Sequence, residues 1–570
     1  MSISVVQDLT SSLLEVLSLR YDQRRQSKMT ADQLHKYNRQ DTWRHVAERS
    51  ELPSGSAKMV RVDGRQVALF EHAGEVYACN NLCPHEGYPL SEGTVAGQCT
   101  LTCNWHNWKF NLKTGENLYG GDRLTTYPVE VRDTGIWIDL ADPPFEAAHA
   151  RVIENLRHAF DDESYDRIAR EIARLIRIGG DPLEPLRCAV DWSWERLEFG
   201  WSHAYAGMAD WLALYRDFTD EAESSLVTLV EPVAHTARDV LREESYPYDG
   251  DVLPWEEAAF LEAVETEDQG AAVAMVRGGL RGGLGFGDFE RGLSAAALAH
   301  YNDFGHSLIY VSKVGDLISE LGEEVAEPLL LSLVRSIVFA TREDLIPEFR
   351  LYRGALDAWG DAEQEDVPGA SDFAGLGIQS SLRMALAGSR GPVEELYRSL
   401  LLANASNMLR FDLSRQQKTR VSISGNVNWL DFTHAITFAN AVRKQCTRFP
   451  ELWPNGLLQM ACFHGRNSAF TTDVDSRDWT SGDPVRDIAE AIDTVMDHGQ
   501  AEPIVSVHLL KTTLAVREEI RLLPSNQAVL LTAALGRFLR SPLKRRQTRR
   551  TAWQSLQFVA REFGDSQAEA

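Results

Sequence analysis

The chain has 570 residues, of which 44% are hydrophobic, so it can form about two to four domains with ordinary buried cores. Its 58 basic and 83 acidic residues give a net charge of −25, which argues against nucleic acid or an anionic membrane as the main partner. It has 7 cysteines and lacks an apolar run of the roughly 18 residues that cross a membrane, which favours a cytoplasmic protein without a disulfide framework.

Three segments follow one another along the chain. Residues 1–40 are predicted to be helical, because apolar residues such as Val6, Leu9 and Leu13 recur at helical spacing. Residues 41–145 contain short β-rich runs, such as residues 67–70, and turn signals, such as Asp63-Gly64, and Asp142-Pro143-Pro144 is expected to end this β domain. Residues 146–570 show helical periodicity. One predicted helix ends at Gly179-Gly180 and has Ile168, Ile172, Leu175 and Ile176 on one face, and another runs from Asp483-Pro484 to Gly499 with Val485, Ile488, Ile492 and Val495 on one face. The sequence therefore predicts a multidomain α+β protein in which a small antiparallel β domain precedes a large all-α domain.

Two short motifs in the β segment carry cysteine and histidine together. They are Cys83-Pro84-His85 and Cys103-Asn104-Trp105-His106, with residues 86–102 between them. Two thiolates and two imidazoles from two loops can hold a [2Fe-2S] cluster, with the thiolates on one iron and the imidazoles on the other. A zinc site uses the same ligand types at similar spacing and is the alternative.

Residues 41–140 resemble a Rieske ferredoxin, or the Rieske domain of an aromatic-ring oxygenase, with Trp108-Lys109-Phe110 and Gly115 after the second motif. The resemblance implies that Cys83, His85, Cys103 and His106 bind the [2Fe-2S] cluster. High-potential relatives carry a disulfide between the two loops and hydroxyl donors to the cluster sulfurs. Tyr88 and Trp105 occupy the disulfide positions here, and Trp108 and Phe110 occupy the hydroxyl positions. We therefore expect a low reduction potential, near about −150 mV.

The helical segment contains a candidate second metal site at His300, Asp303 and His306. Two histidines and one carboxylate form the usual non-haem iron(II) site. On an unbroken helix, however, His300 and His306 would point about 120° apart, because each residue turns the chain by about 100°. A helix break at Gly305 would be needed to bring the two imidazoles to one iron.

A second resemblance concerns the histidine-bearing segments at Gly305-His306-Ser307, Thr433-His434-Ala435 and His508-Leu509-Leu510-Lys511. Helical proteins of the questin oxidase-like class, which oxidatively open polyketide rings, have similar segments. The resemblance implies that His306, His434 and His508, together with His203, line one internal catalytic site.

The sequence favours an oxygenase that relays electrons from the [2Fe-2S] cluster to an oxygen-activating, non-haem iron in the helical domain. Its expected partners are an electron-donating reductase or ferredoxin, O2 and a small organic substrate, without nucleic acid or membrane. A homo-oligomer would allow electron transfer between subunits. One alternative is an electron carrier fused to a non-catalytic helical docking domain. Another is a metal-free questin oxidase-like enzyme with a Rieske regulatory domain.

Overall fold

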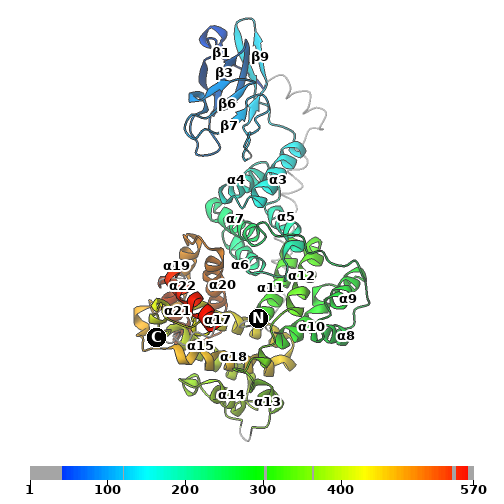
Figure 1. Ribbon diagram of the computed structural model, residues 1–570, viewed down its shortest axis with the longest axis vertical. Helices are drawn as coiled ribbons and strands as arrows, with labels where there is room; N and C mark the ends of the chain where they lie inside the picture. The colour runs from blue at the N-terminus through cyan, green and yellow to red at the C-terminus, as the bar shows by residue number, and fades with distance from the viewer. Residues whose placement is uncertain (1–41, 120, 301–304, 363–364, 542–546, 563–570) are drawn as a thin grey trace, which may run out of the picture. The chain divides into compact units, whose positions relative to one another are not determined.

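The computed structural model describes residues 42–119, 121–300, 305–362, 365–541 and 547–562. The predicted N-terminal helical segment, residues 1–40, lies outside these ranges. The chain divides into two compact units, residues 1–151 and 152–570 (Figure 1). The first is a small antiparallel β unit and the second is helical, so the predicted α+β multidomain class is confirmed.

Among its described residues, the β unit contains ten short strands. They are β1 (Trp43–Glu48), β2 (Ala57–Val62), β3 (Arg65–His72), β4 (Glu75–Asn80), β5 (Thr94–Ala96), β6 (Thr100–Thr102), β7 (Lys109–Asn111), β8 (Thr126–Tyr127), β9 (Val129–Arg132) and β10 (Gly135–Asp139). They form three antiparallel sheets with the orders β1-β10-β9, β2-β3-β4-β8 and β5-β6-β7.

Strand β3 lies at the centre of the largest sheet and contributes to a core on each face. Val67 and Leu69 pack with one hydrophobic cluster, whereas Ala68 and Phe70 pack with the other. This follows from the two-residue repeat of a strand, which points successive side chains to opposite faces. The turn before β3 has Asp63 and Gly64 both at positive φ, as a tight hairpin between twisted strands requires. The predicted strand and turn are therefore confirmed.

The second unit is built from helices and contains most of α3, in which the division between the units falls. The helices are α3 (Phe145–Asp161), α4 (Tyr165–Arg177), α5 (Glu184–Ser193), α6 (His203–Asp217), α7 (Ala222–Asp239), α8 (Glu257–Glu265), α9 (Gln269–Arg281), α10 (Phe286–Ala299), α11 (His306–Leu321), α12 (Ala326–Val338), α13 (Tyr352–Asp357), α14 (Ile378–Ala387), α15 (Val393–Leu409), α16 (Ser414–Gln417), α17 (Trp429–Arg448), α18 (Trp453–Asn467), α19 (Pro484–Met496), α20 (Pro503–Glu519), α21 (Ser525–Arg540) and α22 (Thr548–Glu562).

Four of these helices form a closed circuit of contacts that positions the candidate site. Helix α6 packs on α11 and on α20, and α17 packs on the same two helices (Figure 1). Such a circuit has an interior that side chains from all four helices can reach. None of the helices in the described part of the chain combines the length and the apolar character that crossing a membrane requires.

The predicted helices ending near Gly179 and beginning near Asp483 are present, but their buried faces are narrower than expected. In α4, Ile168, Ile172 and Leu175 are buried, whereas Ile176 is 42% exposed. In α19, Ile488 and Val495 are buried, whereas Val485 is 76% exposed. Both exposed residues lie in a terminal turn of their helix, where packing against neighbouring helices ends.

Candidate functional site

The two cysteine–histidine motifs fold into loops with the same hydrogen-bond pattern. The Cys83 amide donates to the Tyr88 carbonyl at 2.8 Å, and the Cys103 amide donates to the Trp108 carbonyl at 2.8 Å. The fifth residue of each loop then donates back to its cysteine carbonyl and has positive φ, at Gly87 in the first loop and Asn107 in the second. Glycine and asparagine adopt this conformation most readily, so the local sequence shapes both loops.

The loops bring the four expected cluster ligands together. Cys83 and Cys103 are buried, and the His85 and His106 rings lie 4.6 Å apart between centroids. The His85 Nδ1 atom is buried without a hydrogen-bond partner among the described residues, which suits a nitrogen that binds a metal. Burial raises the pKa of the Cys83 thiol to about 11, although backbone N–H groups of His85 and Glu86 oppose the shift. Positively charged irons would stabilise the thiolate, so this donor set fits a [2Fe-2S] cluster.

Aromatic rings connect and cover the ligand loops. Tyr88 and Trp105 stack with their centroids 4.1 Å apart and their planes 17° apart. These are the positions that carry the disulfide in high-potential relatives, so an aromatic contact joins the loops in its place. Trp108 stacks on the His85 ring at 4.7 Å, and Phe110 is fully buried. Neither side chain has a hydroxyl to donate to a cluster sulfur.

The Glu86 carboxylate lies beside both ligand imidazoles, 4.0 Å from His85 Nε2 and 3.6 Å from His106 Nε2. A negative charge there favours the oxidised cluster, which is the more positive of the two redox states. We therefore expect Glu86→Gln to raise the potential by on the order of tens of millivolts from a wild-type value near about −150 mV.

A redox titration followed by circular dichroism measures both values. Glu116→Gln, an exposed substitution of the same kind in the β unit, is the control and should leave the potential unchanged. A clearly positive wild-type potential would contradict the expectation of a low-potential centre. If Glu86→Gln and the wild type have the same reduction potential, the Glu86 charge does not lower the potential of the cluster.

Four histidines from four helices meet inside the helical unit. The Nε2 atoms of His203 and His306 lie 3.1 Å apart, and those of His434 and His508 lie 2.8 Å apart. The rings of His306 and His434 link the two pairs, with their centroids at 4.3 Å. These are the four residues that the second resemblance nominated. We call them the histidine cluster.

The sequence around His306 explains how it enters the cluster. Gly305 has φ 82° and immediately precedes α11, which begins at His306. A Cβ atom at this position would lie 2.1 Å from the Phe438 ring, so only glycine fits both the backbone and the space. On α6, His203 is likewise the first helical residue, after Ser202, whose hydroxyl accepts a hydrogen bond from the Ala204 amide.

Burial disfavours the charged form of three of the four histidines. It holds the pKa values of His203, His434 and His508 well below their usual range, and the neighbouring Lys511 ammonium adds to the shift. The His508 Nδ1 atom lies 2.6 Å from the Ile504 carbonyl oxygen, to which it must donate its proton. The His508 Nε2 atom therefore carries the lone pair. A neutral imidazole held at one nitrogen by a carbonyl is the usual form of a metal-binding histidine.

The spacing of the nitrogens is compatible with one metal ion. One ligand atom from each of His203, His306 and His434 can be chosen so that all three lie within 4.8 Å of one another. Two nitrogens bound to the same ion at about 2.1 Å are separated by roughly 3 Å when their bonds are at right angles. Imidazole ligands suit iron, copper and zinc. The same distances also fit two histidine–histidine hydrogen bonds.

The alternative triad is not assembled by the described residues. His300 lies outside the histidine cluster. It directly follows the last residue of α10, and its Nε2 atom lies 3.6 Å from the Glu265 carboxylate. The expected break at Gly305 is present, but it directs His306 toward His203 and His434 instead. Asp303 lies outside the described ranges.

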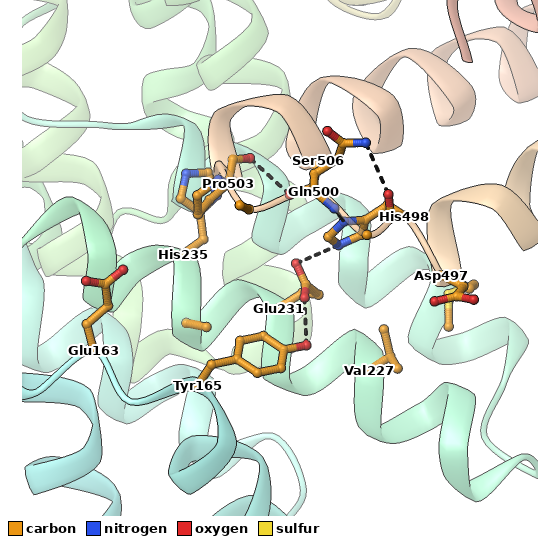
Figure 2. Close-up of a pocket in the computed structure, with 14 residues that line it drawn as sticks. Glu163, Tyr165, Val227, Glu231, His235, Asp497, His498, Gln500, Pro503 and Ser506 are labelled. Carbon is orange, nitrogen blue, oxygen red and sulfur yellow. Dashed lines mark hydrogen bonds and ion pairs between the residues drawn. The ribbon is translucent and has the colours of Figure 1, made fainter. Parts of the chain in front are cut away.

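A pocket of about 500 Å³ is lined by α4, α7 and the connection between α19 and α20 (Figure 2). On its wall the Tyr165 hydroxyl donates to Glu231 at 2.8 Å, and His498 Nε2 lies 3.1 Å from the other Glu231 oxygen. The pocket shares His235 and Pro503 with a second pocket of about 340 Å³, which is also lined by His203. The smaller pocket therefore reaches the histidine cluster at His203.

Sequence reasoning did not identify the pocket residues or Lys511 as functional. Lys511 follows His508 by about one turn of α20, is 2% exposed, and its Nζ has no hydrogen-bond partner among the described residues. Burial lowers its pKa to about 8. A lysine in an apolar helix was the available signal, because such a residue rarely enters a core without a function.

Residues 42–127 match the family model of the Rieske [2Fe-2S] domain. They are similar to the ferredoxin component of the naphthalene 1,2-dioxygenase system of Pseudomonas aeruginosa, with 33% identity over 18% of this chain and 98% of that protein. The ferredoxin subunit of the 3-phenylpropionate/cinnamic acid dioxygenase of Escherichia coli K12 is 42% identical, over 16% of this chain and 89% of its own length.

Among solved structures, the ferredoxin of carbazole 1,9a-dioxygenase from Nocardioides aromaticivorans IC177 matches with 28% identity and a TM-score of 0.17. The match covers 17% of this chain and 98% of the ferredoxin. Each of these similarities falls on the part of the chain that carries the two cysteine–histidine loops. Through that part, the chain belongs to the Rieske [2Fe-2S] family and has an electron-transfer domain like the ferredoxin components of dioxygenases.

Proposed function

We propose that this protein is an oxidoreductase in which the Rieske domain supplies electrons to a non-haem iron held by the histidine cluster. The reaction is the O2-dependent oxidation of a small organic substrate, and a reductase or ferredoxin reduces the Rieske cluster. The observation that carries the proposal is the convergence of His203, His306, His434 and His508 from four separate helices. The match to dioxygenase ferredoxin components supports the electron-transfer half.

The energetics of the helical unit support a metal over a purely structural role. Burying four imidazoles at one point removes polar groups from water, which is unfavourable unless each finds a partner. A metal ion could bind one nitrogen from each of His203, His306 and His434 at once, whereas hydrogen bonds alone join the four nitrogens in two pairs. Gly305 also constrains the backbone to place His306 there. Such a constraint at a buried polar group is typical of functional sites.

When bound, the two metal centres supply one-electron transfer and a coordination position for O2, which no side chain of this protein can provide. The residues of the chain have other tasks. The Ile504 carbonyl fixes the ring of His508, and burial keeps the imidazoles unprotonated. His203 is the partly exposed member and lines the smaller pocket, so the substrate would approach the cluster beside it.

A second candidate is a metal-free oxidative enzyme in which the Rieske domain has a regulatory role. The separations of 3.1 and 2.8 Å between Nε2 atoms favour it, because they equal ordinary hydrogen-bond lengths. In that case the cluster would act through its uncharged imidazoles and the neighbouring Lys511.

Iron counting on the full-length protein distinguishes these candidates. We expect about three irons per chain after anaerobic iron loading, two in the Rieske cluster and one in the histidine cluster. His434→Ala and His508→Ala should each lower the count to about two and leave the electron paramagnetic resonance signal of the reduced Rieske cluster unchanged.

His464→Gln changes a buried histidine outside the cluster and is the matched control, for which the count should remain about three. A wild-type count of two with a normal Rieske signal would contradict the iron site and favour the metal-free enzyme.

A further inference from the structure

The 500 Å³ pocket has a chemical character that restricts what it can bind. Its charged lining residues are three carboxylates, Glu163, Glu231 and Asp497, and no lysine or arginine is among its lining residues. Val227, Ala234 and Met496 contribute apolar surface. A pocket of this volume encloses a small organic molecule, and its polar groups determine which one.

The Glu231 carboxylate is held as a fixed hydrogen-bond acceptor. The backbone N–H of Gln500 donates to His498 Nδ1 at 3.0 Å. The proton of the His498 ring therefore lies on Nε2 and is donated to Glu231 (Figure 2). The Tyr165 hydroxyl donates to the other oxygen of Glu231. Each carboxylate oxygen keeps a further lone pair that can accept a hydrogen bond from a ligand.

The charged side chains of the two neighbouring pockets exclude an anion. Glu163, Glu231 and Asp497 line the larger pocket, and Asp239 and Glu502 line the smaller one. Arg238 also lines the smaller pocket, but it binds both oxygens of Glu163 at 2.9 Å, so these two charges offset each other. The remaining carboxylates would repel an anionic ligand, whereas a ligand with a hydrogen-bond donor can bind Glu231.

We propose that this pocket binds an organic molecule that carries a hydroxyl group and no negative charge, with the hydroxyl donated to Glu231. The proposal rests on the proposed function for the reaction at the histidine cluster, whereas the binding itself does not require a metal there. Glu231 is the residue that determines specificity, and Tyr165 and His498 position it.

Calorimetric titration of the full-length, iron-loaded protein tests this with two probes of similar shape, 4-phenylphenol and 4-phenylbenzoate. We expect the phenol to bind at least about tenfold more tightly than the benzoate, because the negative charge of the benzoate would face the carboxylates of the pocket. Equal or tighter binding of the benzoate, or no binding of the phenol, would overturn the proposal.

Two substitutions locate the binding site. Ala234→Phe fills the pocket and should weaken phenol binding at least about tenfold, whereas Ala222→Phe, on the exposed first turn of the same helix, should not. Glu231→Gln should narrow the preference for phenol over benzoate by about tenfold. Its control is Glu490→Gln, in an exposed ion pair on α19, which should preserve the preference. Phenol binding that Ala234→Phe leaves unchanged would place the site elsewhere.

The same titration with His434→Ala separates this inference from the proposed function. We expect phenol binding to persist in that variant, because Glu231 and the pocket lining are intact. Phenol binding to wild-type protein that holds only the two Rieske irons after iron loading would support the pocket and contradict the iron site. An iron-containing histidine cluster without phenol binding would contradict the pocket alone.

Discussion

Replacing His434 by alanine is expected to slow the oxidation of the reduced Rieske cluster by O2 at least about 100-fold, since loss of even a supporting residue at a metal site can cost that much. The His434 ring lies between its neighbours, with its centroid 4.3 Å from His306 and 4.8 Å from His508. Its removal would leave His508 Nε2 without its partner at 2.8 Å and would open the site to water. Electrons would then remain on the Rieske cluster.

The measurement is rapid mixing of dithionite-reduced protein with O2 in the presence of 4-phenylphenol, followed by the visible absorbance of the Rieske cluster. His464→Gln is the control, because His464 is a buried histidine on α18 that is not part of the histidine cluster. It should reoxidise at the wild-type rate. An equal rate in His434→Ala and wild type would contradict electron transfer through the cluster.

Acidification is expected to destabilise the helical unit, and His464 alone should account for about 3 kcal/mol of this effect. Burial lowers the pKa of His464 from 6.5 to about 4. Above about pH 6.5 the imidazole is neutral in the folded and unfolded chains. As the pH falls toward 4, only the unfolded chain takes up the proton, so the free energy of unfolding decreases until the folded state also binds it.

Urea unfolding followed by far-ultraviolet circular dichroism at several pH values measures this loss. His464→Gln removes the titration while keeping a polar group near the Ser381 hydroxyl, which lies 3.2 Å from His464 Nδ1. We expect its unfolding free energy to fall less steeply over this pH range than that of the wild type. His158→Gln, at an exposed position of α3, is the control and should follow the wild-type curve. A His464→Gln curve parallel to the wild type would show that His464 does not cause the loss.

The Rieske ligands could be predicted from the sequence because their geometry is mostly local. Each motif contains a cysteine, a histidine and, four residues after the cysteine, a residue that tolerates positive φ, at Gly87 and Asn107. Hydrogen bonds within each loop then fix the backbone around the ligands. The same locality explains why the turn at Asp63-Gly64 and the buried strand at Val67–Phe70 were predicted correctly.

The histidine cluster was nominated through short similar segments, but periodicity alone could not have grouped its members. His203, His306, His434 and His508 are separated by long stretches of chain, and a helical repeat states only which face of each helix a residue occupies. The angles at which α6, α11, α17 and α20 pack decide whether those faces meet. The triad of His300, Asp303 and His306 was considered because its members are near in sequence, yet His300 lies beside Glu265.

The sequence by itself determined the α+β organisation and the presence of a Rieske [2Fe-2S] domain, because these depend on composition, residue type and interactions within a few residues. Tertiary structure decided the contacts between distant segments: the stack of Tyr88 on Trp105, the exposure of Ile176 and Val485, and the burial of Lys511 beside the histidines. It also decided the Tyr165–Glu231–His498 wall of the pocket. The physical reason is that burial and long-range contacts arise only when whole helices and strands pack, and no local pattern encodes the packing partner.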